Sequence, residues 1–345
     1  MERSQIGWFT VATLIIAGMI YFTDISKFFS HIRTANKFYL ALAILVGIMA
    51  IPIWTNSWHQ LINHMGEELT FWQSLKLFST GLFMNSVTPL GQFGGEPFMA
   101  YIIDDNTRLN YEKSLSAVIS ADIINAIPIF TFIMGGSGVL LFFNSFNQLF
   151  TEIIYISISI IIVGSVLAYL LWFKSGYIEK RILSVTEQVS NRLGRGEGVV
   201  DSLEDRLESL EESFETVGEN PRSLVKMTAI AHLSFVFQVA SLYLVMLSVG
   251  VKTDITPLYF VLPMASLANF SPTPGGSGAY EAAMATILAT PLFGVSGSLA
   301  VTIGILYRFT TFWPGLLIGY LSISTLPNMG KDEIEEAIES EYPDN

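Results

Sequence analysis

Apolar runs long enough to cross a lipid bilayer recur along the whole sequence. They lie at approximately 6–23, 38–58, 70–88, 115–140, 151–173, 224–249, 256–271 and 298–325. A hydrocarbon core of about 30 Å is crossed by roughly 20 residues of α-helix, and a helix satisfies its backbone hydrogen bonds within one segment. The sequence therefore predicts an all-α integral membrane protein with about eight transmembrane helices.

The composition supports this prediction. Of the 345 residues, 51% are hydrophobic and only 14% are charged, whereas ordinary soluble domains are about one-quarter charged. Much of the net charge of −12 falls in two polar segments, 201–219 and 332–345, so the apolar part of the chain is close to neutral. The chain contains no cysteine, which excludes disulfides and thiol-bound metal.

Two short segments interrupt the apolar pattern in the same way. The first, "TPLGQFGGE", runs from Thr88 to Glu96, and the second, "TPGGSGAYE", runs from Thr273 to Glu281. Threonine, proline, one glycine and the glutamate keep the same spacing in both. Proline lacks a backbone donor and glycine adopts conformations closed to other residues, so a helix stops at each motif. The sequence therefore predicts two re-entrant or broken helices in an internal pseudo-repeat.

A polar cavity is the expected consequence of these interruptions. We expect a helix to resume near Glu96 and near Glu281 with unpaired N–H groups directed into the gap, and two such helix starts would form an anion site near mid-membrane. Simple kinking of two ordinary helices is the alternative interpretation. The candidate cavity residues of the two motifs are Asn85, Thr88, Pro89, Gly91, Gly95, Glu96, Asn269, Thr273, Pro274, Gly275, Gly276, Gly278 and Glu281.

Ionisable residues at membrane depth are few, and each costs about 3 kcal/mol on insertion scales. They are Glu96, Asp122, Glu281 and Arg308, with the depth of His232 and Lys76 left open. Because Arg308 has no acidic neighbour in sequence, we expect its partner to be Glu281 or Asp122 on another helix. One interpretation is an ion pair that only fixes helix packing. The other is that Arg308 binds a lipid phosphate while the carboxylates hold a cationic or hydroxylated head group. For His232 we expect hydrogen bonding within the bundle.

The distribution of lysine and arginine indicates the orientation. Lysines and arginines mark the first connection and cluster in the longest one: Lys27, Arg33 and Lys37 in the first, and Lys174, Lys180, Arg181, Arg192 and Arg195 in the longest. The positive-inside rule predicts that loops 24–37 and 174–222 are cytoplasmic. We expect the chain to lie in the plasma membrane. We expect a membrane domain at 1–330, containing the helical loop 174–222, and an acidic tail at 331–345.

The long loop carries its own helical pattern. Apolar residues recur at 203, 207, 210, 214 and 217, opposite a face of carboxylates. Anionic lipid would repel that face, so we expect a cytosolic helix that packs on its neighbour or recruits another protein.

Missing motifs exclude several functions. The sequence has no Walker GxxxxGK[ST] pattern, and His59 and His64 lack the HExxH arrangement of zinc hydrolases. No basic surface interleaved with aromatic residues suggests nucleic-acid binding. We therefore expect no ATPase activity, no metal, no cofactor and no nucleic-acid partner.

The second motif and a later helix carry a family resemblance. "SPTPGGSGAYEAAM", followed downstream by "YRFTTFW", resembles the membrane domain of lysylphosphatidylglycerol synthases, a flippase-like family, and the resemblance covers essentially the whole chain. A basic residue commonly follows the earlier Gly-Glu of the family, but here Pro97 and Phe98 follow. The resemblance points to Pro89, Gly95, Glu96, Pro274, Gly275, Gly276, Gly278, Glu281 and Arg308.

The resemblance also implies a function. Bifunctional members carry an aminoacyltransferase domain after the membrane domain, whereas this sequence ends at "GKDEIEEAIESEYPDN". We therefore expect a stand-alone member without enzymatic activity, which moves a phospholipid or related polar lipid between leaflets beside a separate lipid-modifying enzyme. Two alternatives remain open: a secondary transporter of a small anionic solute, and a non-transporting accessory subunit of a lipid-modifying enzyme.

Overall fold

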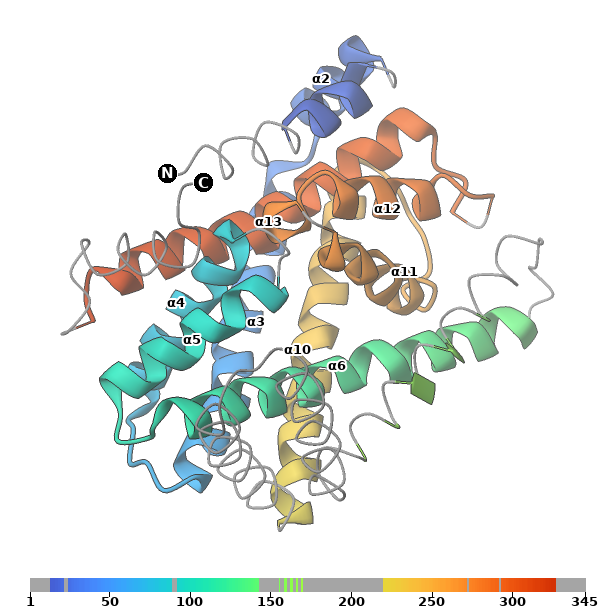
Figure 1. Ribbon diagram of the computed structural model, residues 1–345. Helices are drawn as coiled ribbons and strands as arrows, with labels where there is room; N and C mark the ends of the chain where they lie inside the picture. The colour runs from blue at the N-terminus through green and yellow to red at the C-terminus, as the bar shows by residue number, and fades with distance from the viewer. Residues whose placement is uncertain are drawn as a thin grey trace, which may run out of the picture.

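The computed structural model describes residues 13–21, 24–88, 92–142, 155, 158–159, 162–163, 166, 169, 220–271, 273–291 and 293–326. The elements of this described part are helices (Figure 1). They are α2 (Ile25–Thr34), α3 (Lys37–His64), α4 (Phe71–Val87), α5 (Gln92–Asn106), α6 (Tyr111–Phe142), α10 (Pro221–Ser248), α11 (Leu258–Ser266), η1 (Leu267–Phe270), η2 (Pro274–Gly276), α12 (Ala279–Leu288) and α13 (Gly297–Ile323). A further helix, Thr13–Tyr21, precedes α2.

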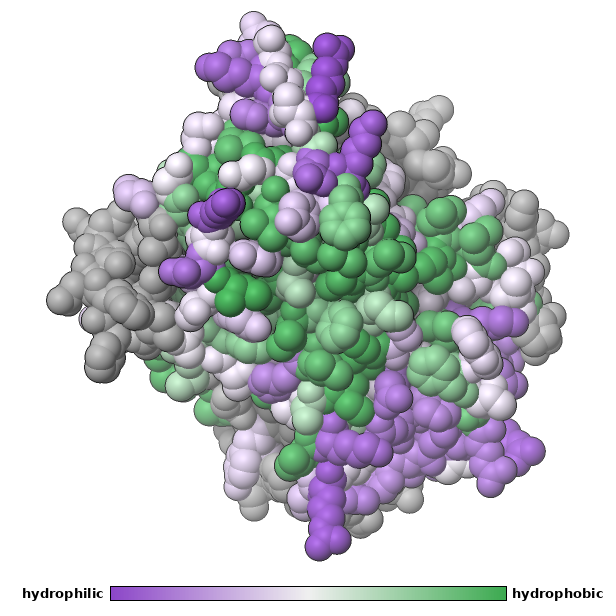
Figure 2. All heavy atoms as spheres, turned by 180° about the vertical axis from the view of Figure 1, so that it is seen from behind, coloured by the Kyte–Doolittle hydropathy of each residue, from purple (hydrophilic) through white to green (hydrophobic). Residues whose placement is uncertain are grey.

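Four of the described helices have the length and hydropathy of membrane spans: α3, α6 over Tyr111–Gly136, α10 and α13. The helices Thr13–Tyr21 and α2 pass the same test only as a pair, and they are bent by 94°. Apolar side chains gather across the middle of one face of the molecule, between hydrophilic groups at its top and bottom (Figure 2). The all-α membrane architecture predicted from the sequence is therefore confirmed for the described residues.

The predicted count of eight spans is not confirmed. The run at 70–88 forms α4, whose 17 residues extend only about 26 Å at 1.5 Å per residue. The run at 256–271 forms α11, nine residues long, and then the short η1, which together are too short to cross alone. Most of the run at 151–173, the loop at 174–219 and the tail at 331–345 lie outside the described residues.

The first predicted loop, 24–37, contains a helix. Asp24 begins α2 by accepting hydrogen bonds from the N–H groups of Ser26 (3.0 Å) and Lys27 (3.3 Å), which are otherwise unpaired at a helix start. Two residues after α2 ends, Asn36 caps α3 in the same way, accepting from the N–H of Phe38 at 3.0 Å. The polar residues that indicated a loop therefore serve as helix caps.

Small residues bring the long helices into close contact. In α10, Ser241 donates to the carbonyl of Ala43 in α3 at 2.9 Å, and its hydroxyl lies 2.9 Å from that of Thr310 in α13. Gly47 packs directly against the backbone of Thr310, and Gly319 packs against that of Ser79 in α4. Such contacts let helix backbones approach closely in an apolar environment. They hold α13 along the molecule, with α3 and α4 packed on it and α12 packed towards its N-terminal end (Figure 1).

Candidate functional site

The two interrupted segments lie against each other. The first interruption follows α4, where Thr88 ends the helix and its hydroxyl donates to the carbonyl of Met84 at 2.8 Å. From the second interruption, η2 packs on α4, and η1 contacts α5. A side-chain carbon at Gly275 would lie 3.4 Å from the carbonyl oxygen of Ser86. The motifs are thus adjacent in space, as a shared site requires, although Pro89 and Gly91 lie outside the described residues.

Three glycines shape the second interruption. Gly275, Gly276 and Gly278 have φ values of 55°, 67° and 84°, in the left-handed region that glycine adopts without strain. Thr273 precedes η2, and its hydroxyl lies 2.8 Å from that of Ser271. Pro274 then occupies the first position of η2, where no backbone donor is needed. These residues turn the chain from η1 into α12 within a few positions, as the sequence predicts for a broken helix.

Glu281 and Arg308 form an ion pair at this turn. Arg308 Nε donates to Glu281 Oε1 at 3.3 Å, and the two residues are only 6% and 4% exposed. The partner of Arg308 is therefore Glu281, the first of the two alternatives expected from the sequence. Because each charge is buried, each depends on the other for compensation, and removing one leaves the other unpaired in a low-dielectric interior.

The rest of the guanidinium group is also enclosed by the protein. Arg308 Nη2 donates to the carbonyl of Gly275 at 2.6 Å and to Ser277 Oγ at 3.4 Å. Its Cζ atom lies 3.7 Å from the centre of the Phe312 ring and 5.0 Å from that of Tyr280. Aromatic faces attract a cation in this geometry. This environment favours the interpretation in which Arg308 fixes helix packing, over the one in which it binds a lipid phosphate.

The carboxylate of Glu281 also caps the start of α12. The N–H of Gly278 donates to Glu281 Oε2 at 2.7 Å, so the residue that pairs with Arg308 also caps the helix. The helix begins at Ala279, two residues before the glutamate. At this second interruption the chain itself therefore supplies a carboxylate at the helix start, in the place where an external anion is expected from the sequence.

The first interruption has a different chemistry. Its helix, α5, begins at Gln92 and places the half-buried Glu96 close to Asp122 of α6, near enough for the two acidic groups to influence each other. No basic residue contributes to the surroundings of either carboxyl group in the described part of the chain. Asp122 Oδ2 is buried without a hydrogen-bond donor there. Two acidic groups therefore lie close together without a basic side chain beside them in the described part of the chain.

Buried amide oxygens add to this polar region. Asn85 Oδ1 and Asn269 Oδ1 have no hydrogen-bond partner among the described residues, and neither has Asn125 Oδ1, which follows Asp122 by about one helical turn on α6. A side-chain carbon at Gly95 would lie 2.7 Å from Asn85 Cα. Buried acceptors almost always have a donor in folded proteins. These oxygens are therefore suited to accept hydrogen bonds from water or from a bound polar group.

The sequence analysis missed several residues of this region. Phe312 follows Arg308 by four positions, Tyr280 directly precedes Glu281, and Asn125 follows Asp122 by three. Residues three or four apart share one face of a helix, and this spacing is the signal that could have identified Phe312 and Asn125. The prediction for His232 is confirmed, since its ring nitrogens lie 2.7 Å from Thr131 Oγ1 and 2.8 Å from the carbonyl oxygen of Thr228.

These features define a class of protein. Apolar helices of span length surround two adjacent broken segments with charged residues at both, which is the organisation of a polytopic α-helical membrane protein with discontinuous helices. Within that class, the chain belongs to the family of the lysylphosphatidylglycerol synthase TM region, whose sequence profile matches residues 9–319. The family resemblance predicted from the two motifs is therefore confirmed.

Relatives from archaea match over nearly their whole length. A UPF0104 membrane protein of Methanothermobacter thermautotrophicus is 22% identical, with 95% of this chain and 96% of the relative covered. The relative from Methanocaldococcus jannaschii is 23% identical, with 91% and 92% covered, and that from Pyrococcus horikoshii is 21% identical, with 90% and 93% covered. These names describe membrane proteins and state no activity, so the comparisons support a stand-alone member of the family.

Proposed function

We propose that this protein moves a phospholipid or related polar lipid between the leaflets of the plasma membrane, acting as a carrier and not as an enzyme. The head group would enter the polar region around Glu96, Asp122 and Asn125 while the hydrocarbon chains stay in the bilayer. One observation carries the proposal: two carboxyl groups meet at the first interruption without a basic partner among the described residues. Membership of the lysylphosphatidylglycerol synthase TM-region family supports a lipid substrate.

The physical task is to lower the cost of moving a polar head group through hydrocarbon. A polar group transferred to an apolar medium without a hydrogen-bond partner loses about 2–7 kcal/mol, and a bare charge loses far more. The carboxyl groups of Glu96 and Asp122 and the amide oxygens of Asn85 and Asn125 offer a series of acceptors within the helix bundle. Helices with polar side chains facing each other are the setting in which such groups are stable in a membrane.

The charge of this region favours a head group with an amine. Arg308 is already paired with Glu281, so the acidic groups left without a basic partner among the described residues are those of Glu96 and Asp122. Two carboxyl groups held this close resist carrying two negative charges, and an ammonium group placed between them would favour the ionised forms while donating up to three hydrogen bonds. We therefore infer that an aminoacylated or ethanolamine-type lipid is a better substrate than one without a cation.

The remaining candidate residues frame this region. Thr88, Pro89, Gly91 and Gly95 would shape the first side of the path, and Asn269, Thr273, Pro274, Gly275, Gly276 and Gly278 would shape the second side. In this proposal Glu281 and Arg308 position the second segment and do not touch the substrate.

The two alternative functions fit less well. A carrier for a small anion needs an accessible cation, whereas Arg308 is enclosed by Glu281 and two aromatic rings. A non-transporting accessory subunit would be consistent with the Glu281–Arg308 pair, since that pair fixes helix packing in either case. It gives no reason to place Glu96 beside Asp122, an arrangement that opposes stability.

Reconstitution into liposomes tests the proposal. The bilayer would contain a chain-labelled lipid with a free amine or the same lipid with its amine acetylated, and leaflet exchange would be followed by chemical quenching of the outer label. We expect the native protein to accelerate exchange of the amine lipid, and Glu96→Gln or Asp122→Asn to reduce that rate about tenfold, or about 1.4 kcal/mol of barrier. The exposed Glu68→Gln is the matched control and should leave the rate unchanged.

Two outcomes would contradict the proposal. Exchange equal to that of empty liposomes for both lipids would favour the accessory subunit. Uptake of phosphate or sulfate into the same vesicles, without lipid exchange, would favour the anion carrier.

A further inference from the structure

The short helix α2 separates its side chains into two faces. Ile25, Phe29 and Ile32 form an exposed apolar face, which the buried Phe28 continues into the core. The opposite face consists of hydroxyl and basic side chains from Ser26, Lys27, Ser30, His31, Arg33 and Thr34. An amphipathic helix of this kind, with basic residues on the polar face and aromatic ones on the other, is typical of a helix that lies in the plane of the membrane surface.

The packing of α2 places it at the end of two membrane spans. It is joined to the start of α3 through Ala35 and Asn36, and the N–H of Asn36 donates to the carbonyl of Ser248, the last residue of α10, at 2.6 Å. Both α3 and α10 are 28-residue helices with the hydropathy of a span. The start of one and the end of the other are therefore level, and α2 lies beside these two helix ends. Figure 1 shows α2 projecting at this end of the molecule.

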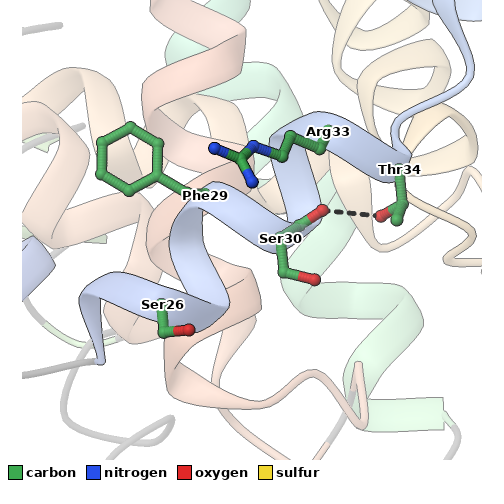
Figure 3. Close-up of a pocket in the computed structure, with 5 residues that line it drawn as sticks. All are labelled: Ser26, Phe29, Ser30, Arg33 and Thr34. Atoms are coloured by element: carbon green, nitrogen blue, oxygen red, sulfur yellow. Dashed lines mark hydrogen bonds between the residues drawn. The ribbon is translucent and has the colours of Figure 1, made fainter.

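An open recess of about 460 Å³ lies along α2 where its polar face meets its apolar face (Figure 3). Ser26, Phe29, Ser30, Arg33 and Thr34 line it, and the guanidinium group of Arg33 extends towards the Phe29 ring. Thr34 uses its hydroxyl proton locally, donating to the carbonyl of Ser30 at 2.9 Å. Within the described residues Arg33 forms no salt bridge, and it lines the recess with a planar fork of hydrogen-bond donors.

The second cation of the helix differs in this respect. Lys27 Nζ lies 3.3 Å from Asp24 Oδ2, at the opposite edge of the polar face, so part of its charge is already compensated. Arg33 and Lys27 therefore have the same charge on the same helix, but only Arg33 adjoins both the hydroxyl groups of the recess and an exposed aromatic side chain. This difference provides a matched pair of positions for mutation.

We propose that α2 lies in the membrane–water interface and that Arg33, with the hydroxyls of Ser26 and Ser30, binds the phosphate of an anionic phospholipid. Guanidinium and phosphate form charge-assisted hydrogen bonds in a bidentate geometry, and the serine hydroxyls add neutral donors. The apolar face beside the recess contacts the acyl chains of the same lipid, which commits the site to a lipid phosphate and not to free phosphate. The binding site is separate from the region of Glu96 and Asp122 and does not depend on translocation.

The absence of native cysteine allows the depth of α2 to be measured cleanly. Single-cysteine variants of the full chain, Phe29→Cys and Lys27→Cys, would carry a spin label in nanodiscs that contain phosphatidylglycerol. We expect the label at position 29 to be relaxed mainly by oxygen, which concentrates in hydrocarbon, and the label at position 27 to be relaxed mainly by a water-soluble nickel complex. Equal access of the nickel complex to both positions would overturn the interfacial placement.

Lipid binding tests the role of Arg33 directly. Spin-labelled phosphatidylglycerol and phosphatidylcholine would be compared for the protein-bound fraction in phosphatidylcholine vesicles holding the full chain. We expect Arg33→Gln to lower the preference for phosphatidylglycerol by about threefold to tenfold, Arg33→Lys to retain part of it, and Lys27→Gln to change it by less than about twofold. Equal loss in Arg33→Gln and Lys27→Gln would overturn the proposed site and leave only a diffuse attraction of basic residues. Displacement of the lipid by millimolar inorganic phosphate would also overturn it.

Discussion

Glu96 and Glu281 occupy corresponding places in the two broken segments, but their surroundings are opposite. Glu281 is paired with Arg308 at 3.3 Å and also caps α12 through the N–H of Gly278. Glu96 lies against another carboxyl group, that of Asp122, and no described basic residue compensates them. At the second interruption the glutamate of the motif is therefore paired with an arginine and caps a helix. At the first interruption it lies beside another acidic group, without a basic partner among the described residues.

The contrast between Glu281 and Glu96 suggests that one glutamate stabilises the fold and that the other is available to bind a ligand. A buried ion pair that is also a helix cap has all its partners in the protein, so it has little capacity left for a ligand. An acidic pair with neighbouring unpartnered amide oxygens opposes folding, and such groups are kept in a membrane when they bind or conduct something. In the proposed function, the substrate path therefore runs along the first interruption, while the second fixes helix packing.

The two interruptions nevertheless share one packing device. Asn85 lies against Gly95 and Asn269 lies against Gly276, with contacts that leave no room for a side-chain carbon on either glycine. In both cases the amide oxygen of the asparagine is buried without a donor in the described part of the chain. An asparagine therefore packs against a glycine at both interruptions, although the two contacts have different spacings along the chain.

The proposed difference between the two glutamates would be refuted if replacing Glu281 and replacing Glu96 had the same effect on stability. We expect Glu281→Gln to lower the free energy of unfolding by about 3–5 kcal/mol, because it leaves Arg308 buried and unpaired. Glu96→Gln should change it by about 1 kcal/mol or less and in the stabilising direction, because it relieves repulsion with Asp122. Thermal unfolding in detergent, followed by tryptophan fluorescence, measures both. A loss of equal size in the two variants would show that the sites are equivalent.

A double variant isolates the role of the pair itself. Replacing both partners, as Glu281→Leu with Arg308→Met, should recover part of the stability that Glu281→Gln loses, since an apolar pair of similar volume avoids the cost of an unpaired charge. Recovery will be incomplete, because the cap on Gly278 is also removed.

The shared packing device is tested by adding one carbon to each glycine. Gly95→Ala would place that carbon 2.7 Å from Asn85 Cα, and Gly276→Ala would place it 2.9 Å from Asn269 Cα. Neither backbone can yield easily, so we expect each variant to lose about 1–3 kcal/mol of stability, with more at Gly276 because its φ is positive. Gly135→Ala, which meets nothing within 4 Å, is the control and should show no loss. Native stability in Gly95→Ala or Gly276→Ala would refute the close packing.

The smallest stability effect is expected at the asparagines. Replacing Asn85 or Asn269 by leucine removes a buried acceptor that lacks a donor in the described structure, so the free energy of unfolding should change by about 1 kcal/mol or less. Lipid exchange should fall in Asn85→Leu, at the interruption that contains Glu96. It should fall less in Asn269→Leu, at the interruption that contains Glu281. Equal exchange in these two variants would assign the path to both interruptions alike.

Local chemistry explains what could be predicted from the sequence. Pro274 and the glycines after it stop a helix by their own backbone properties, so the second break could be located from residue types alone. The isolation of Arg308 in an apolar stretch required a partner on another helix, and that reasoning reduced the partner to two candidates. Runs of apolar residues were less informative about length, since α4 and α11 are shorter than the spans expected at 70–88 and 256–271.

Other features depended on contacts that the sequence does not contain. Polar residues at 24–37 indicated a loop, whereas Asp24 and Asn36 cap helices, because a cap and a loop use the same residue types. The pairing of Glu96 with Asp122 joins α5 to α6 through side chains that no spacing rule connects. The enclosure of Arg308 by Tyr280 and Phe312 likewise requires α12 and α13 to pack together.

The sequence by itself determined that this chain is a helical membrane protein, where its apolar pattern is interrupted, and which few charges lie within it. Only the tertiary structure decided which of those charges are neutralised. The physical reason is that a helix break is a property of adjacent residues in the chain, whereas charge compensation at membrane depth depends on which side chains of separate helices come within a few ångströms of each other.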